Sequence, residues 1–432
     1  MFSKKLTERL SKTNPAIFSF YAIVAAFSTY FCMYAFRKPV AATSYEDIML
    51  WGMGIKTVFI ISQTIGYTIS KFSGIKVIAE MKGSNRALSI LGLIGFAELM
   101  LLGFAIAPDF IKPAFILLNG LALGLIWGLV FSFLEGRTNT ELLGAGLSVS
   151  FVVASGWTKS AGLYFLSIGI PEFWMPFVTG LAFALPLLLS VWMLGHIPPP
   201  SQTDEDARTK RAPMNAKARK DFFKTFSVGI ILLVLVYMML TAFRDFRDNF
   251  MADILAEHMN AISIDFGTIE TYVALALLAV VGSMMLIKNN MRALMVNHVL
   301  IIAGFLMVGL ATWLFRAEMI DPNMWMILTG VGGYMGYIPF NCLLFERLIA
   351  TFRYVSNAGF LIYVADAFGY TAAIGIMLYK DSFAFDGTWT DFFTDASWMM
   401  MFVGTALTIA SLIYFIRKER NWIPKKELKI QN

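Results

Sequence analysis

The stretch that decides the fold is Tyr30-Phe-Cys-Met-Tyr34-Ala-Phe-Arg37, which closes an apolar run of helix length. A similar stretch, Tyr237-Met-Met-Leu-Thr241-Ala-Phe-Arg244, closes another such run about 200 residues later. In each copy the polar residues stand at positions i, i+4 and i+7, which share one face of an α-helix. A single arginine at the end of an apolar run is explained by a side chain that reaches the lipid headgroups. Two copies in the same register indicate an internal repeat.

The composition is that of a membrane protein with several spans. Hydrophobic residues make up 58% of the 432 residues and charged residues 15%, which is too apolar for a water-soluble chain of this length. Four basic residues lie within the first twelve, before the first apolar run, and no small-residue cleavage site follows that run. We therefore expect an amphipathic helix at the membrane surface here, and not a cleaved signal.

Twelve apolar runs are long enough to cross a hydrocarbon core of about 30 Å. They begin near Pro15, Trp51, Arg86, Lys112, Leu143, Phe173, Phe226, Phe266, Met291, Met324, Arg353 and Trp398. One long polar stretch, rich in Pro, Lys and Arg, separates the sixth run from the seventh. The sequence thus predicts an N-terminal six-helix bundle over residues 1–195, a cytoplasmic linker over 196–222 and a C-terminal six-helix bundle over 223–432.

The basic residues predict the orientation. With both termini and the linker in the cytoplasm, most of the 35 lysines and arginines face that side. The outer loops then collect acids such as Asp109, Glu172 and Asp253. We expect a multi-pass protein of the cell inner (cytoplasmic) membrane. The net charge of +6 does not indicate nucleic acid as a partner, because the basic excess faces the anionic inner leaflet of the bilayer.

The repeat extends beyond its opening pair. Matching fragments occur in the same order in both halves: Arg86-Ala-Leu with Arg292-Ala-Leu, Ile55-Lys56-Thr57 with Ile269-Glu270-Thr271, Leu134-Glu135 with Phe345-Glu346, Ala145-Gly146 with Ala358-Gly359, and Gly156-Trp-Thr with Gly369-Tyr-Thr. Any single match is at the level of chance. Five matches in one order indicate a duplicated six-helix unit.

A parallel repeat of six helices resembles the major facilitator superfamily of transporters, and the resemblance covers the whole chain. It implies an all-α polytopic fold of 12 transmembrane helices in two six-helix bundles. The segment between spans two and three, residues 66–76, resembles the Gly-x-x-x-Asp-Arg loop signature of that superfamily, with Ser70 in place of the usual acid.

Two narrower resemblances concern parts of the chain. The Tyr-x6-Arg-Lys ending of span one, with Arg37 matched by Arg244 in span seven, resembles the organophosphate:phosphate antiporters. In that branch two arginines bind the phosphate. The amino-acid sequence of spans four and five is similar to that of a bacterial family of unassigned function.

Charged side chains inside spans are the next candidates, because an ionised group at mid-bilayer costs at least roughly 2.5–3.5 kcal/mol without a cavity or partner. Lys159 lies in span five and Asp366 near the middle of span eleven, both of which line the cavity in the superfamily. We expect a cavity role for both, with an ion pair between helices as the alternative. Glu98 and His298 lie in peripheral spans, where packing or a hydrogen-bonded structural role is expected.

Lys56 and Glu270 occupy matching places in the two halves, near the outer ends of spans two and eight, and have opposite charge. We expect the two side chains to pair and close an outer gate. The alternative is that Lys56 is a simple cavity lysine. For Asp366 we expect a coupling role, as the proton-responsive group if transport is proton-coupled. The alternative there is that Lys159 pairs with Asp366 and holds it ionised.

Arg37 and Arg244 are expected to face each other across the cavity, where two guanidiniums suit a phosphate or a carboxylate. Further substrate-binding candidates on the same faces and in span five are Tyr30, Tyr34, Tyr237 and Lys159. Asp248, four residues after Arg244, is a possible partner that would neutralise it. The predicted solute is anionic, with a zwitterion or a neutral solute as alternatives.

Other chemistry finds little support. The three histidines lie in separate regions without a His-x-x-x-His pair, and there is no Cys-x-x-Cys, so we expect neither a metal nor another cofactor. Cys32 and Cys342 lie inside apolar runs and are expected to be packing residues. No Walker or Rossmann glycine motif occurs, so neither an enzyme nor nucleotide-driven transport is predicted.

The sequence therefore predicts a monomeric secondary active transporter, a symporter or an antiporter, which moves a small phosphorylated or carboxylated solute by alternating access. The alternative is a non-transporting membrane sensor or assembly protein on the same scaffold.

Overall fold

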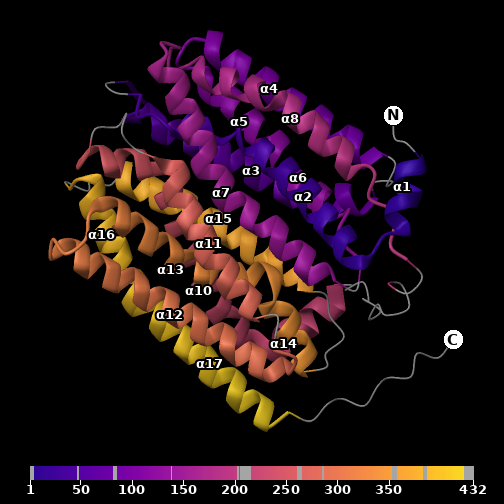
Figure 1. Cartoon of the computed structure of the whole chain (residues 1–432). Helices are drawn as coiled ribbons and strands as arrows, with labels where there is room; N and C mark the ends of the chain where they lie inside the picture. The colour runs from indigo at the N-terminus through magenta and orange to yellow at the C-terminus, as the bar shows by residue number, and fades with distance from the viewer. Residues whose placement is uncertain are drawn as a thin grey trace.

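A computed structural model describes residues 4–45, 48–80, 85–137, 139–201, 204, 216–259, 265–284, 287–352, 358–382 and 387–422. Two helical bundles lie side by side, the first drawn in indigo to magenta and the second in salmon to yellow (Figure 1). We call them the N half and the C half.

The N half begins with a short surface helix and contains one small hairpin. Its elements are α1 (Lys4–Ser11), α2 (Pro15–Tyr34), the 3₁₀ helix η1 (Lys38–Ala41), β1 (Met49–Leu50) paired antiparallel with β2 (Met53–Gly54), α3 (Ile55–Glu80), α4 (Arg86–Ile106), α5 (Lys112–Leu123), α6 (Ile126–Phe131), α7 (Thr140–Ser167) and α8 (Met175–Leu194). The predicted N-terminal surface helix is therefore present as α1.

The C half repeats this order of helices. Its elements are α10 (Ala216–Ala256), α11 (Phe266–Met284), α12 (Asn290–Arg316), α13 (Pro322–Cys342), α14 (Leu344–Phe352), α15 (Ala358–Ser382), α16 (Trp389–Met399), the π-helical turn η4 (Met400–Gly404) and α17 (Thr405–Arg420). In the C half α13 and α14 form a bent pair with an angle of 44° between them, whereas α5 and α6 of the N half together qualify as one span, Lys112–Phe131.

Local sequence explains where several helices begin. The side chains of Asn14, Asn289 and Asp321 each accept a hydrogen bond from the first turn of α2, α12 and α13. Thr388 forms a capping box with Asp391 at the start of α16. Such caps satisfy backbone N–H groups that have no partner inside the helix.

The twelve predicted spans are confirmed by the fold. By length and composition, and over the described residues only, eight helices qualify as membrane spans, or nine with the bent pair α13–α14. The helices α3, α7 and α15, with 26, 28 and 25 residues, are also long enough and complete the set. The last span begins at Trp389, earlier than the predicted Trp398, because α16 and α17 are continuous through η4.

Two assignments of residues to loops are wrong. Residues 66–76 lie inside α3, which continues without a break to Glu80, and do not form a loop. Asp253 lies inside α10 and is buried, although it was expected in an outer loop. In both cases polar residues that suggested a loop instead belong to helices whose polar faces meet other protein side chains.

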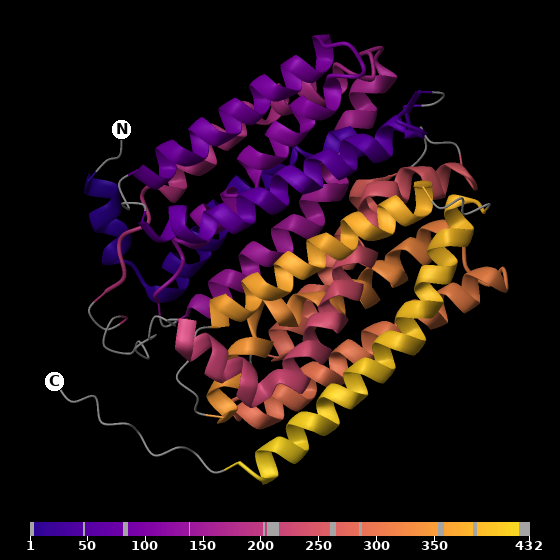
Figure 2. The same cartoon turned by 180° about the vertical axis from the view of Figure 1, so that it is seen from behind.

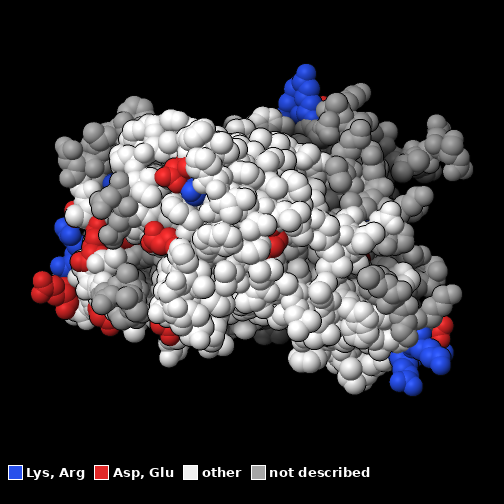
Figure 3. Space-filling view, turned by 90° about the horizontal axis from the view of Figure 1, so that it is seen from above, with Lys and Arg blue, Asp and Glu red and all other residues white. Residues whose placement is uncertain are grey.

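The two ends of the molecule and the surface between them differ in the charged side chains that they expose. We call the end that holds α1, α14 and the last turns of α17 the linker end, and the opposite end, where α16 begins, the distal end (Figure 1). Charged side chains gather at the ends, and a broad, mostly uncharged surface lies between them (Figure 3). Several of the spans expose apolar side chains, such as Phe20, Leu185 and Phe402, as expected for contact with lipid.

Candidate functional site

The candidate site lies where the two halves meet. Helix α7 of the N half lies beside α11 of the C half, and α3 lies beside α15 (Figures 1 and 2). At the α3–α15 contact the rings of Tyr67 and Tyr370 are 5.3 Å apart. At the α7–α11 contact the Trp157 indole N–H donates to the Thr271 hydroxyl over 3.0 Å. The interface therefore contains polar and aromatic groups rather than a continuous apolar core.

Arg37 follows the end of α2 and is buried, with 7% of its surface exposed. Its guanidinium lies over the ring of Tyr67, 4.2 Å from the ring centre. Among the described residues no carboxylate forms an ion pair with it, and its Nε atom is buried without a hydrogen-bond partner. A buried guanidinium that is not directly paired is costly, which sets Arg37 apart from the paired charges of this interface.

Arg244 is the repeat partner of Arg37 and lies in α10. Its guanidinium lies over Tyr337 at 4.1 Å, which copies the stacking of Arg37 on Tyr67. Unlike Arg37, it is neutralised, because its Nη2 lies 2.5 Å and its Nε 3.0 Å from Oδ1 of Asp245. The alternative partner Asp248 is not used. The repeat has thus kept the stacking but not the charge balance.

The two arginines share neighbours. Tyr34 is within electrostatic reach of both guanidiniums, and so is Tyr370. The Tyr34 ring packs edge-on against Tyr30, 5.4 Å between ring centres. The structure therefore brings Arg37, Arg244, Tyr30 and Tyr34 into one region.

Tyr237 and Asp366 form a polar cluster in the C half. The Tyr237 hydroxyl donates to Oδ1 of Asp366 and lies 3.0 Å from the Tyr337 hydroxyl. From the N half, Lys71 lies 3.9 Å from Oδ2 of Asp366. The alternative prediction that Lys159 pairs with Asp366 is wrong, because Lys159 pairs elsewhere. Lys71, which belongs to the segment expected between spans two and three, forms the ion pair with this acid that is seen among the described residues.

A second cluster ties the halves together near the distal end. Lys38 from η1 lies 2.5 Å from Asp248 of α10 and donates to Asn249 over 2.9 Å. Lys159 from α7 lies 2.9 Å from the same carboxylate. Ser155 also donates to it. All five side chains are buried.

The predicted ion pair between Lys56 and Glu270 is wrong in this structure. Lys56 pairs with Asp253 of the C half at 2.5 Å. Glu270 pairs with Arg247 at 2.7 Å, inside the C half. Arg247 also donates to the backbone oxygen of Met326, over 3.1 Å from Nε and 2.8 Å from Nη2. Sequence reasoning missed Arg247 and Asp253, although the charges in the otherwise apolar α10 were a visible signal.

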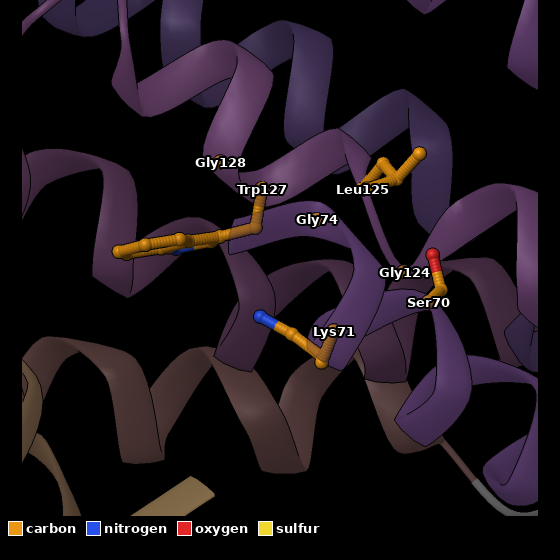
Figure 4. Close-up of a pocket in the computed structure, with 7 residues that line it drawn as sticks. All are labelled: Ser70, Lys71, Gly74, Gly124, Leu125, Trp127 and Gly128. Carbon is orange, nitrogen blue, oxygen red and sulfur yellow. The ribbon is translucent and has the colours of Figure 1, made fainter. Parts of the chain in front are cut away.

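A small pocket opens between α3 and the α5–α6 junction, in the part of α3 that faces the linker end. Its lining residues are Ser70, Lys71, Gly74, Gly124, Leu125, Trp127 and Gly128 (Figure 4). The Lys71 ammonium points towards the Trp127 ring and lies 5.3 Å from its centre. This lysine therefore lies between the pocket and Asp366.

Glu98 and His298 lie outside this interface. His298 is buried, and its ring nitrogens lie 2.8 Å from the Leu294 backbone oxygen and 3.0 Å from the Ser411 hydroxyl. Both Glu98 carboxyl oxygens are buried without a hydrogen-bond partner among the described residues, against Gly180 of α8. Within the described part of the chain no group of three or more His, Cys, Asp or Glu side chains is arranged to hold a metal ion.

Solved structures with a similar fold are transporters. A mutant of the peptide transporter POT in complex with alafosfalin has a TM-score of 0.60 and 14% sequence identity, over 92% of this chain and 95% of that chain. A D-xylose-proton symporter has a TM-score of 0.57 and 14% identity, over 94% of this chain and 97% of that chain. These similarities confirm the major facilitator fold, with two six-helix bundles.

No curated protein sequence matches this chain. One family model does match it, from residue 39 in η1 to residue 418 in the last helix, and so covers most of both halves. The chain is a member of that family, the family of unknown function DUF5690.

Proposed function

We propose that this protein is a secondary transporter that moves a small anionic solute, phosphorylated or carboxylated, across the cytoplasmic membrane by alternating access. The fold is shared with a peptide transporter and a D-xylose-proton symporter, which supports transport as the activity. In this proposal the protein acts as a monomer, residues 1–195 and 223–432 move as two bodies, and both termini and the linker 196–222 face the cytoplasm.

The proposal that the solute is anionic rests on the surroundings of Arg37. It is buried at the meeting point of the halves, rests on Tyr67 and has no carboxylate partner among the described residues. Arg244 differs, because Asp245 already neutralises it. In this proposal the solute's anion binds Arg37 in preference to Arg244, and the hydroxyls of Tyr30 and Tyr34 supply neutral donors nearby.

A thermal-shift screen of small phosphates and carboxylates against the purified protein finds the ligand, and Arg37→Lys then tests the site. Lysine keeps the charge but loses the planar fork, so one charge-assisted hydrogen bond worth roughly 1.5–3 kcal/mol is lost and affinity falls by about tenfold or more. Arg244→Lys is the matched control and should have a smaller effect, because its charge remains paired with Asp245.

Normal affinity in Arg37→Lys would refute an anion site at this residue. Uptake of the same ligand by liposomes that contain the protein separates a transporter from a receptor. Binding without uptake would favour the sensor on the same scaffold.

Asp366 is the proposed coupling residue. It accepts a hydrogen bond from Tyr237 in its own half and faces Lys71 of the other half, so its charge affects how the halves approach each other. Asp366→Asn should abolish accumulation of solute on a pH gradient while exchange of solute between the two sides continues. Measured in liposomes, a variant that still concentrates solute on a pH gradient would show that this carboxyl is not the coupling group.

A further inference from the structure

Among the described residues, the side chains that hold the carboxylate of Asp248 all come from the other half. Lys38 reaches one oxygen at 2.5 Å, and Lys159 reaches the other at 2.9 Å, where Ser155 also donates. Lys159 donates in addition to the backbone oxygen of Asp248 over 2.7 Å. The donors come from two elements of the N half, η1 and α7, and only the acceptor comes from α10.

The charges in this cluster do not balance. Two ammonium groups, with 4% and 1% of their residues' surface exposed, share one carboxylate, so the cluster carries an excess of one positive charge. The neighbouring pair is different, because Lys56 alone meets Asp253, which also accepts from Ser44 over 2.8 Å. The charges of Lys56 and Asp253 therefore balance, whereas those of Lys38, Lys159 and Asp248 do not.

Two cations and a hydroxyl that converge on a carboxylate form the kind of donor set that binds small oxyanions. Because all three donors belong to the N half, their arrangement does not depend on the position of α10. If the halves separate at the distal end, Asp248 leaves with α10 while the donors stay together.

We propose that Lys38, Lys159 and Ser155 form a carboxylate-binding cup in the N half. Asp248 occupies the cup while the distal end is closed, and a carboxylate or another small oxyanion occupies it when the distal end opens. This inference rests on the proposed alternating movement of the halves. It gives the solute's anion a first binding place on the distal side, separate from Arg37. Because Asp248 and the anion compete, binding of the anion favours opening.

Chemical rescue tests the cup. The variant Asp248→Ala empties it, and thermal unfolding of the purified variant is followed with increasing sodium formate or acetate. The expected result is a saturable rise in Tm that acetamide and sodium chloride at equal ionic strength do not give. Adding Lys159→Met to the variant should remove the rise.

Asp253→Ala is the matched control, because it removes a buried carboxylate that meets only one lysine. We expect formate to act on it at least about tenfold more weakly, since one ammonium holds an oxyanion less well than two. Equal rescue of the two variants, or no saturable rise in Asp248→Ala, would overturn the cup.

A measurement on the chain with Asp248 in place covers the case in which Asp248→Ala does not fold. A cysteine is introduced by Thr271→Cys, at the seam between α7 and α11, after Cys32 and Cys342 are replaced by serine. Formate should speed labelling of this position relative to acetamide, because it competes with Asp248 and loosens the distal end. An unchanged labelling rate would contradict the proposal.

These readouts do not require transport. If rescue fails and the Arg37 experiment succeeds, only the cup is lost. If rescue succeeds and no solute is transported, the cup stands as an anion site and the proposed function fails.

Discussion

Arg247 and Glu270 form a buried ion pair whose role is internal to the C half. The pair joins α10 to α11 at 2.7 Å, and the hydrogen bonds from Arg247 to the Met326 backbone oxygen add α13. Both residues are almost completely buried. Such a pair fixes the relative positions of three helices, and loss of one partner leaves an uncompensated charge.

We therefore predict that Arg247→Met lowers the free energy of unfolding by about 3–5 kcal/mol. Adding Glu270→Leu should restore most of it, because an apolar pair of similar volume replaces a buried ion pair at little cost. Unfolding of the purified variants in detergent measures both values. A double variant as unstable as the single one would show that the helices depend on the charges themselves.

At the residue scale the sequence located Arg37 through the repeat, since two arginines in matching positions stand out in apolar runs. It did not locate the partner of Arg244. Helical spacing favours Asp248, but that carboxylate binds Lys38 and Lys159 from the other half, which leaves Asp245 for Arg244. Competition from a segment far away in the chain is not visible in local spacing.

Helices α3 and α5 pack closely because glycines remove side chains from their contact. A Cβ atom on Gly120 would collide with the backbone oxygen of Gln63, and one on Gly66 would collide with the backbone oxygen of Leu117. The contact lies directly behind Arg37, whose backbone oxygen accepts from the Gln63 amide over 3.4 Å. Glycine packing thus positions the helix that carries Tyr67 and Lys71.

Gly120→Ala is predicted to destabilise the protein by roughly 1–3 kcal/mol, because the added methyl group forces two backbones apart. Gly95→Ala in α4 is the matched control, since nothing lies within 4 Å of its added Cβ atom. Thermal unfolding of both variants compares them. A loss in Gly95→Ala as large as in Gly120→Ala would show that the effect is not steric.

The apolar runs predict the positions of most helices, but they do not predict that segment 66–76 is helical. Polar and glycine residues there are typical of a loop, yet α3 continues through them. They remain helical because Ser70 and Gly74 line the pocket beside α5 and α6, and Lys71 meets Asp366. A polar helix inside a protein and a loop in water have similar composition, so composition alone does not separate them.

For the molecule as a whole, the ion pairs that cross between the halves are concentrated towards one end. Four ion pairs between described residues cross between the halves, and three of them, Lys38–Asp248, Lys159–Asp248 and Lys56–Asp253, lie towards the distal end. Only Lys71–Asp366 lies nearer to the linker end. In this structure the ion pairs that join the halves therefore lie mainly towards the distal end.

Lys56→Ala and Asp253→Ala should each increase labelling of a distal cysteine by an impermeant reagent, and the double variant should add little to either. The reason is that both substitutions break the same contact, so their effects are not independent. Lys56→Ala with Glu270→Ala serves as the control and should be additive, because these residues do not touch each other. Additive effects for Lys56 and Asp253 would mean that this pair does not hold the gate.

The repeat predicted two bundles of six spans, and the structure has them. It placed Lys56 opposite Glu270 because symmetry relates them. In the structure Lys56 instead pairs with Asp253 and Glu270 pairs with Arg247. Neither Asp253 nor Arg247 lies in the fragments by which the two halves were matched, so the repeat did not predict these partners. The limits of the linker, 196–222, stay a prediction, because residues 205–215 lie outside the described part of the chain.

Helix α3 also has a consequence for how the protein is made. It is flanked by α2 and α4, which both qualify as spans by composition, but it is not among the helices that do. Each lysine at the centre of a helix adds about 2.5–3.5 kcal/mol to the cost of insertion, and α3 carries Lys71 within its length. We therefore expect α3 to enter the bilayer together with its neighbours and not alone. The lysine that meets Asp366 at the interface is thus also one for which we expect a cost during membrane insertion.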